Sequence, residues 1–334
     1  MISKHSSHAP RPPGARPSAA LVLGLALSLL MATTAGARPA AASAQPPRAQ
    51  VLVGGGAGPA VCRSASRRYA GRAAWLSRGI FAAMKGRSSA VGLAAADTRT
   101  GITCTFHARL HFHSASIVKV IILGTLLHDL MVKHHSLSAR QVTLTTEMIT
   151  ESDNAAATAL WDQDGMRNLR HFVDLARMTD TRLGQDGFWG LTQVTADNEM
   201  RLLNLLVTKN KVLDKPSRAY ALKLMADVVA AQRWGVTAGA PADVHAHVKN
   251  GWLPDPDLWV INSIGAFTGR DRVYRIVVLT RDNPSMAYGV DTVQDIAEVI
   301  NHDLSPGQKP AVLPSAPYPS WGTPDEQIPA SGRP

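Results

Sequence analysis

The segment Ser116-Ile117-Val118-Lys119 opens a run of apolar residues that extends to Leu130. The run is apolar almost all the way round a helical wheel, which predicts a buried helix. Ser116 would lie at the start of this helix, where free backbone N–H groups favour a developing negative charge. Lys119 follows three residues later, so the two side chains share one helical face. The segment therefore predicts a buried helix that begins with a serine and a lysine side by side.

A serine and a lysine placed in this way can perform nucleophilic chemistry. A serine hydroxyl is a poor nucleophile until a base takes its proton. Lys119 could be that base only if its pKa falls well below about 10.4, and burial or a second nearby cation would lower it. A purely structural interpretation is also open, in which Ser116 caps the helix and Lys119 extends its charge to the surface. The pattern S-x-x-K alone is expected about once by chance in a chain of this length.

A second polar string, Ser152-Asp153-Asn154, comes directly before the helix-forming segment that begins at Ala155. Ser152 could relay a proton between a nucleophile and a leaving group, and Asn154 could hold a substrate amide. Alternatively, Ser152 or Asp153 could simply cap the helix that follows. We expect Asp153 to have such a structural role.

A third string, Lys249-Asn250-Gly251, ends a segment over residues 243–249 in which apolar and polar residues alternate. This period of two predicts a strand, with Lys249 on its polar face. Such a strand could bind a peptide-like substrate along its edge, and Gly251 would let a ligand approach the backbone. The backbone N–H of Trp252 would be an oxyanion donor beside that of Ser116. The simpler alternative is an exposed lysine before a turn glycine.

Together, in this order, the three strings resemble those of the penicillin-recognising serine enzymes, the superfamily of class A β-lactamases and D,D-peptidases. The resemblance extends over roughly residues 65–303. It implies an α/β fold of the α+β type, in which helices flank an antiparallel sheet of about five strands. A mostly helical subdomain is expected at about residues 115–234.

The resemblance also implies a role for each matching residue. It makes Ser116 the acylated nucleophile, Lys119 a base, Ser152 a proton relay and Lys249 an electrostatic anchor. The residues expected to bind substrate are Asn154, Asn250, Gly251 and Trp252. For a substrate carboxylate, the sequence offers four candidates without ranking them: Arg270, Arg272, Arg281 and Ser263.

The chain departs from the class A pattern in two places. Asn250 stands where the family has a threonine or serine hydroxyl. Class A enzymes also carry a Glu-x-x-Leu-Asn segment whose glutamate activates the deacylating water, and residues 155–195 contain no glutamate. Only Gln185, Asp186 and Gln193 could orient a water there. We therefore expect acylation to be intact and deacylation to be slow, as in a penicillin-binding protein.

The two ends of the chain differ in composition from the rest. Residues 1–44 combine a basic start, an apolar run and small residues, which predicts a secretory signal peptide. An uncleaved membrane anchor is the alternative. Residues 45–60 are expected to be a linker, 61–303 the catalytic domain, and 304–334, with eight prolines, a disordered tail. The protein is therefore expected to be secreted and extracellular, in association with the cell wall.

The formal net charge of the chain is +10. A chain that begins at Gln45 would carry +6, because residues 1–44 hold four basic residues and no acidic residue. This charge suits contact with an anionic cell wall, and the absence of a basic run argues against nucleic acid. The expected partners are a β-lactam or a peptidoglycan stem peptide. We expect a monomer with no membrane span after signal cleavage.

Cys62 and Cys104 are the only cysteines. An even pair in a secreted protein predicts a disulfide bond. Two unpaired thiols remain the alternative, and neither cysteine has the sequence context of a nucleophile.

Histidines at alternate positions raise the question of a metal site. His111 and His113, and likewise His245 and His247, are spaced to share a strand face. The chain has neither of the strings H-x-H-x-D-H and H-E-x-x-H. We therefore expect an enzyme that uses no metal and no other cofactor.

The expected function is that of a secreted serine hydrolase that forms an acyl-enzyme at Ser116 with a β-lactam or a D-Ala-D-Ala-like amide. Hydrolysis of the β-lactam type, the activity behind antibiotic resistance, is favoured over peptidase action because the layout is that of a single-domain class A enzyme. Two alternatives stay open. One is a non-catalytic module that binds penicillin or cell-wall fragments, and the other is a D,D-peptidase or an esterase.

Overall fold

The computed structural model describes residues 61–255, 257–305, 307 and 309–311. The expected signal peptide (1–44) and linker (45–60) lie outside the described residues, as does most of the expected tail.

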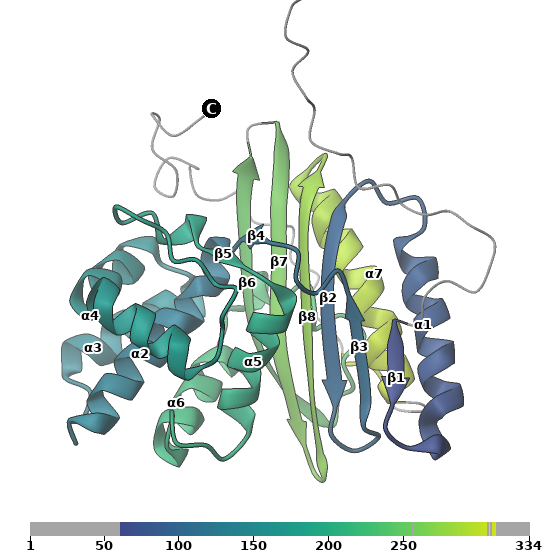
Figure 1. The fold of residues 1–334 in the computed structure, drawn as a ribbon, viewed down its shortest axis with the longest axis horizontal. Coiled ribbons are helices and arrows are strands. Elements are labelled where there is room, and N and C mark those ends of the chain that lie inside the picture. The colour runs from purple at the N-terminus through teal and green to yellow at the C-terminus, as the bar shows by residue number, and fades with distance from the viewer. Residues whose placement is uncertain (1–60, 256, 306, 308, 312–334) are drawn as a thin grey trace, which may run out of the picture. The chain divides into compact units, whose positions relative to one another are not determined.

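A six-stranded antiparallel sheet forms the centre of the fold, with the strand order β1-β3-β2-β8-β7-β6 (Figure 1). Its strands are β1 (Cys62–Ser64), β2 (Ala90–Asp97), β3 (Ile102–Phe106), β6 (Val244–Asp255), β7 (Leu258–Gly269) and β8 (Arg272–Asn283). The expected antiparallel sheet is confirmed. It has one strand more than expected because the three residues of β1 pair with β3 at the edge of the sheet.

Helices cover both faces of the sheet. On one face, α1 (Ala70–Met84) and α7 (Met286–Leu304) pack against each other, and α7 lies along β7 and β8. On the other face, α5 (Ala196–Val207) contacts β2, β7 and β8. The remaining long helices form a helical region beside the sheet: α2 (Lys119–Val132), α3 (Ala139–Thr146), α4 (Asn154–Leu175) and α6 (Lys215–Ala226). The site described below lies where this region meets the edge strand β6 (Figure 1).

Local structure decides where the first and last helices begin. The first helix begins at Ala70, because Arg67–Tyr69 form a separate turn of 3-10 helix. The last helix begins at Met286. Ser285 caps it, since its side chain accepts a hydrogen bond from the backbone N–H of Tyr288.

The segment after α7 pairs with the residues before β6. The backbone N–H of Ala242 donates to the carbonyl of Lys309 at 3.1 Å, and that of Ala311 donates to Ala240 at 2.6 Å. Pro310 does not prevent this pairing, because its neighbours supply the N–H and C=O groups. The described backbone pairing therefore extends to Ala311.

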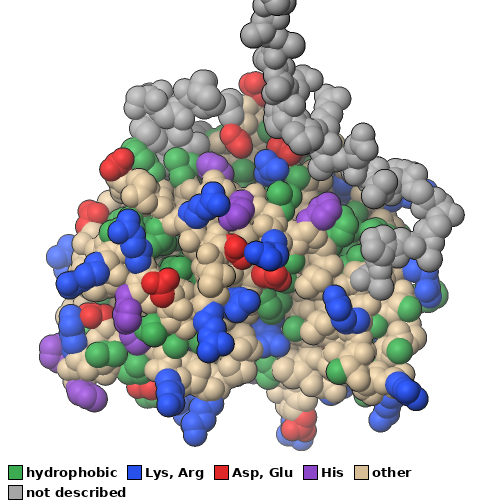
Figure 2. Space-filling view, in the orientation of Figure 1, with side chains coloured by type: hydrophobic (Ala, Val, Ile, Leu, Met, Phe, Trp, Pro, Cys, Tyr) green, Lys and Arg blue, Asp and Glu red, His purple; other side chains and the backbone are tan. Residues whose placement is uncertain are grey.

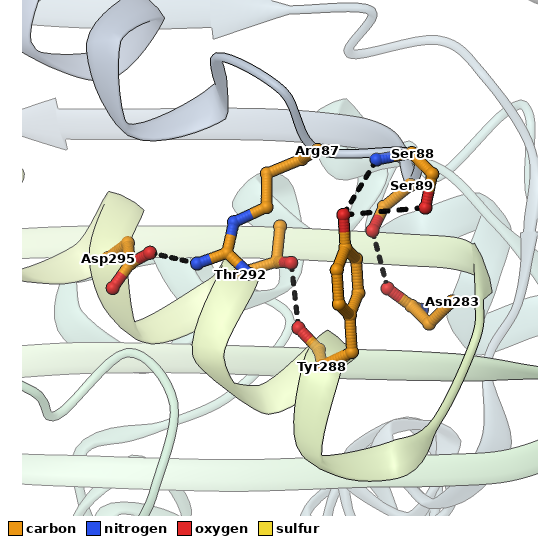
Figure 3. Close-up of polar contacts among 7 residues, drawn as sticks. All are labelled: Arg87, Ser88, Ser89, Asn283, Tyr288, Thr292 and Asp295. Carbon is orange, nitrogen blue, oxygen red and sulfur yellow. Dashed lines mark hydrogen bonds and ion pairs between the residues drawn. The ribbon is translucent and has the colours of Figure 1, made fainter.

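A polar cluster ties α7 to the start of β2 (Figure 3). Arg87 forms an ion pair with Asp295 and lies over the ring of Tyr288, with 5.1 Å between the guanidinium carbon and the ring centroid. The backbone N–H of Ser88 donates to the Tyr288 hydroxyl at 2.8 Å. Next to it, Ser89 donates to the side-chain oxygen of Asn283 on β8 at 2.6 Å. These contacts fix the helix against two central strands.

The segment Ala115–Val132 is apolar and long enough to cross a membrane by length and composition alone. Most of it is buried inside the fold, and α2 packs against α4. Burial among other helices explains its apolar surface, as is usual for the core helix of a folded domain.

Cys62 and Cys104 face each other across the β1–β3 pair and form a disulfide bond that spans 42 positions of sequence. On the chain-entropy model, a bridge of this span contributes about 4 kcal/mol to the free energy of unfolding. We expect the double variant Cys62→Ala, Cys104→Ala to lose that amount in urea-induced unfolding. A loss below about 1 kcal/mol would show that the bridge does not restrict the unfolded chain in this way.

Candidate active site

A short turn of 3-10 helix, η2 (Ala115–Val118), places Ser116 directly before α2. Ala115 has a φ of +47°, an uncommon backbone conformation for a residue with a side chain. The turn is held from the sheet, because the side-chain amide of Asn262 on β7 donates to the carbonyls of His113 at 2.8 Å and Ser114 at 3.1 Å. Such locally strained geometry persists only where its surroundings impose it, and it is common at active sites.

Lys119 is the first residue of α2, and its side chain is fully buried. Its ammonium nitrogen donates hydrogen bonds to the Ser152 carbonyl at 2.6 Å, to the Ser152 hydroxyl at 3.2 Å and to the side-chain oxygen of Asn154 at 2.8 Å. The ring of Trp189 lies 4.8 Å from the same nitrogen. The surface interpretation of Lys119 is therefore wrong: the amine is held inside the protein, one helical turn from Ser116.

Ser152 lies between two lysines. Its hydroxyl accepts hydrogen bonds from Lys119 at 3.2 Å and from Lys249 at 2.9 Å. The residue has a φ of +62° at the end of a π-helical turn, η3 (Glu147–Glu151). Asp153, not Ser152, caps α4, since its carboxylate accepts from the backbone N–H of Ala156 at 2.6 Å. The hydroxyl of Ser152 is thus left to contact the lysines.

Lys249 reaches this hydroxyl from β6 and is also fully buried. Its second described contact is with the carbonyl of Asn250 at 3.0 Å. Burial lowers the pKa of Lys249 to about 7, because the charged amine loses its hydration. Near neutral pH the side chain is therefore present in both its charged and its neutral form.

This pKa predicts a pH dependence of acylation. Lys249 is charged below about pH 7 and neutral above it, and a charged anchor attracts a substrate carboxylate more strongly. The second-order rate constant of acylation, which reports groups of the free enzyme, should fall as the pH rises through about 7. Lys249→Arg stays charged at higher pH, so its profile should lack this fall. The same descending limb in both proteins would contradict the assignment.

Gly251 allows the sheet to approach the serine turn. A Cβ atom at this position would lie 2.8 Å from the Ser116 backbone nitrogen and 2.8 Å from the Ser114 carbonyl oxygen. The group that lies close to Gly251 is thus the backbone of the protein's own serine turn, where a ligand was expected. Since β6 is the edge strand of the sheet, this contact brings the Ser116 amide next to the strand backbone that continues to Trp252.

Asn250 does not face the site, which corrects the expectation that its side chain contacts substrate. Its amide nitrogen donates to the carbonyls of Gln232 at 2.8 Å and Trp234 at 2.9 Å. Its oxygen accepts from Ser263 at 2.6 Å. The strand alternates its faces, so Asn250 points away from the side that carries Lys249. It fastens β6 to the segment before it instead.

The four candidates for a substrate carboxylate are now distinguished. Ser263 is buried and bonded to Asn250, and Arg272 is buried and donates to the carbonyl of Leu304. Arg270 lies in the exposed turn between β7 and β8. Arg281 lies over the ring of Phe112, at 5.9 Å, in the segment that leads to the serine turn.

A small buried apolar cluster lies beside Ser116. Ala115 packs with Leu253 of β6 and Val260 of β7, and the partly buried Leu191 packs against this cluster. The residue before Ser116 is thereby held against the edge of the sheet.

Two of the four paired histidines form hydrogen bonds with neighbouring elements of the fold. His247 is hydrogen-bonded to the Leu222 carbonyl at 2.7 Å and to the Thr268 hydroxyl at 2.9 Å. His111 is bonded to the Asp180 carbonyl at 2.9 Å. Burial lowers the pKa of His113, so its ring tends to stay uncharged. Within the part of the chain that the structure describes, no three histidine, cysteine, aspartate or glutamate side chains are grouped to hold a metal ion.

The structure shows the surroundings of the three residues that were expected to orient a deacylating water. The side-chain amide of Gln185 donates to the Leu183 carbonyl at 2.8 Å, and Asp186 is exposed in a turn. Gln193 pairs through its backbone with Arg182. It is Trp189, from the short helix η4 (Trp189–Leu191), that lies against Lys119.

Sequence reasoning missed two residues of the site. Trp189 lies between Asp186 and Gln193 in the chain, but an aromatic ring over a lysine cannot be inferred from spacing. Asn262 carries a readable signal, since an amide in the middle of an apolar strand must find partners when buried. Its partners, the carbonyls before Ser116, come from a distant part of the chain.

The comparisons agree with this geometry. Residues 134–304, just over half of the chain, match the model of the beta-lactamase enzyme family. This match includes Ser152, Asn154 and Lys249 and begins after Ser116. No curated protein sequence matches the chain.

Three solved structures illustrate the similarity of fold. The beta-lactamase from Sphaerobacter thermophilus is 18% identical, with a TM-score of 0.59, and the match covers 68% of this chain and 95% of that one. A class A beta-lactamase from Bacteroides cellulosilyticus is 17% identical, with a TM-score of 0.60 and coverage of 69% and 96%. PBP-A is 15% identical, with a TM-score of 0.60 and coverage of 69% and 95%.

The fold is thus shared along nearly the full length of these proteins, and the family match carries the assignment. Taken with the sheet, the helical region and the cluster around Ser152, the family match shows that this chain belongs to the beta-lactamase enzyme family.

Proposed function

We propose that the protein is a serine acyl-transfer enzyme in which Ser116 forms an acyl-enzyme with a β-lactam or a D-Ala-D-Ala-like amide. One observation carries the proposal: two buried lysines, Lys119 and Lys249, both donate hydrogen bonds to the hydroxyl of Ser152. Lys119, one of the two donors, follows the nucleophile Ser116 by three residues in the chain. A set of this kind can move a proton without contact with bulk water.

The proposed acylation follows from these contacts. The Ser116 oxygen attacks the carbonyl carbon while its proton passes to the neutral amine of Lys119. The proton then moves through the Ser152 hydroxyl to the substrate nitrogen, and the carbon–nitrogen bond breaks. The backbone N–H groups of Ser116 and Trp252 hold the oxyanion, and Asn154 contacts the substrate amide. All atoms of a β-lactam remain on the enzyme after this step.

The surroundings of Lys119 support slow deacylation. Hydrolysis of the acyl-enzyme needs a group that activates water, and a carboxylate is the common choice. Here the aromatic ring of Trp189 lies over the Lys119 amine, and the side-chain amide of Gln185 donates to the Leu183 carbonyl. The site would then release its product slowly, as a penicillin-binding protein does. Efficient β-lactam hydrolysis would need another group, away from the contact between Trp189 and Lys119, that activates the water.

The lifetime of the adduct tests this proposal. Purified protein is mixed with benzylpenicillin, free antibiotic is removed, and intact-protein mass is followed. We expect an added mass of one antibiotic that outlasts many turnover times of a typical enzyme, which are about 0.1 s. Rapid loss of the adduct with continued consumption of antibiotic would contradict slow deacylation. Release of D-alanine from a D-Ala-D-Ala peptide, measured in parallel, would favour the peptidase alternative.

A non-catalytic binding module is the second candidate. The missing glutamate between Asn154 and Ala196 favours it, whereas the cluster of Lys119, Ser152 and Lys249 argues against it. Reversible binding of benzylpenicillin without any covalent adduct would support this candidate.

We further propose that the protein acts outside the cell, at the cell wall, as a monomer. The proposal rests on the composition of residues 1–44 and on the positive charge of the remaining chain. Detection of a shortened chain in the culture medium of an expressing cell would support it. A full-length chain confined to the cytoplasm would contradict it.

A further inference from the structure

A cavity of about 350 Å³ opens on the side of the sheet that carries α5, at a place where no residue of the Ser116 site contributes. It lies between the end of α4, α5 and strand β8. Its lining is Leu175, Ala176, Arg177, Met200, Arg201, Asn204, Leu205 and Arg275. The volume is at the small end of the range for ligand sites in proteins, which is about 300 to 1,000 Å³. Lys and Arg side chains lie over this part of the surface (Figure 2).

The charge of this lining is of one sign. Three of the lining residues are arginines and none is acidic. Arg177, Arg201 and Arg275 form no ion pair with any residue in the described part of the chain. Like charges gathered round a cavity repel one another, and an anion between them would remove that repulsion.

Arg275 is the most informative of the three because it is buried, with 7% of its surface exposed. It donates one hydrogen bond, to the side-chain oxygen of Asn204, and its Nε–H has no acceptor among the described residues. A guanidinium has five N–H groups, so a buried one with a single partner is poorly satisfied. Burial lowers the pKa of Arg275, and the charge of Asp97 opposes that shift.

Asp97 does not neutralise Arg275 by direct contact. Its carboxylate accepts hydrogen bonds from the hydroxyl of Thr100 at 2.6 Å and from the backbone of Arg99 and Thr100. The carboxylate is thus committed to the turn between β2 and β3. The guanidinium of Arg275 remains available to an oxyanion, which it can bind through two parallel hydrogen bonds.

We propose that this cavity binds a small organic anion, with a carboxylate or phosphate group held by Arg275, Arg201 and Arg177. The apolar side chains of Leu175, Met200 and Leu205 contact the rest of the ligand. The cavity is separate from the acyl-transfer site, since it is built on α5 and β8 rather than on β6. The proposal therefore does not depend on the proposed function.

Calorimetric titration of the full-length protein tests the proposal with three probes that share a six-carbon chain: hexanoate, hexyl phosphate and hexan-1-ol. We expect at least one of the two anions to bind saturably, with a Kd of about 1 mM or tighter, and hexan-1-ol not to bind. Binding of hexanoate alone would assign the head group as carboxylate, and binding of hexyl phosphate alone would assign it as phosphate. Failure of both anions to bind at millimolar concentration would overturn the proposal.

Three variants test whether the anion binds in this cavity. Arg275→Met should weaken anion binding about tenfold or more, the loss expected for a charged hydrogen bond. Arg201→Gln, at an exposed position that the fold does not need, should weaken it about fivefold. The matched control is Arg140→Gln on the exposed face of α3, which should leave the Kd unchanged. Equal binding by wild type and Arg201→Gln, with both proteins folded, would show that the anion binds elsewhere.

Discussion

Replacement of Lys119 by methionine is expected to lower the rate of acylation by a benzylpenicillin probe about 10³-fold. The amine of Lys119 is buried three residues after Ser116 and is the proposed acceptor of the Ser116 proton, and general bases of this kind contribute about 10²- to 10⁴-fold. Methionine has a similar length and no proton to exchange. The measurement is the second-order rate constant of adduct formation, followed by intact-protein mass.

A matched control separates loss of the base from loss of the fold. Lys133→Met changes a lysine at the other end of the same helix, where the amine is exposed and pairs with Asp129. This variant should acylate at the wild-type rate, since surface ion pairs of this type contribute about 0.3–0.5 kcal/mol. Both variants should keep a cooperative thermal transition. Wild-type acylation by a folded Lys119→Met protein would exclude Lys119 as the base.

Replacement of Gly251 by alanine is expected to lower the acylation rate about 100-fold. The new Cβ would lie 2.8 Å from both the Ser116 nitrogen and the Ser114 oxygen. Both neighbours are backbone atoms, so neither can rotate away, and the strand and the serine turn must separate. A displacement of reacting groups by about 1 Å can cost about 10²-fold in rate.

The control for this prediction is Gly71→Ala on α1, where a Cβ would meet no atom within 4 Å. That variant should acylate normally and gain up to about 1 kcal/mol of stability from the better helix propensity of alanine. An unchanged acylation rate in Gly251→Ala would mean that the approach of β6 to Ser116 has no part in the chemistry.

Much of the fold could be predicted because the patterns that decide it are local. The apolar run after Ser116 predicts a buried helix, and the alternation before Lys249 predicts a strand; α2 and β6 occupy these positions. Boundaries were less predictable. The strand β6 continues to Asp255, well past Gly251, because pairing with β7 extends it. A glycine inside a strand and a glycine that ends one look alike in sequence.

Which residues meet in the site could be predicted only in part, because some of them are brought together by packing between distant parts of the chain. The spacing of Ser116 and Lys119 within one helical turn follows from the sequence. The meeting of Lys119 and Lys249 at Ser152 depends on how the helical region closes onto the sheet. The resemblance to a known family, rather than any local pattern, suggested that meeting. Where the resemblance misled, at Asn250, alternation along the strand already indicated the side facing away from Lys249.

The central claim is that Ser116 carries the acyl group, and intact-protein mass of wild type and Ser116→Ala after exposure to benzylpenicillin tests it most directly. We predict that the wild-type protein gains the mass of one whole antibiotic, because ring opening loses no atoms. Peptide mapping should place the adduct on Ser116, and the Ser116→Ala variant, equally folded, should gain no mass. An adduct of equal yield on both proteins, or none on either, would contradict the claim.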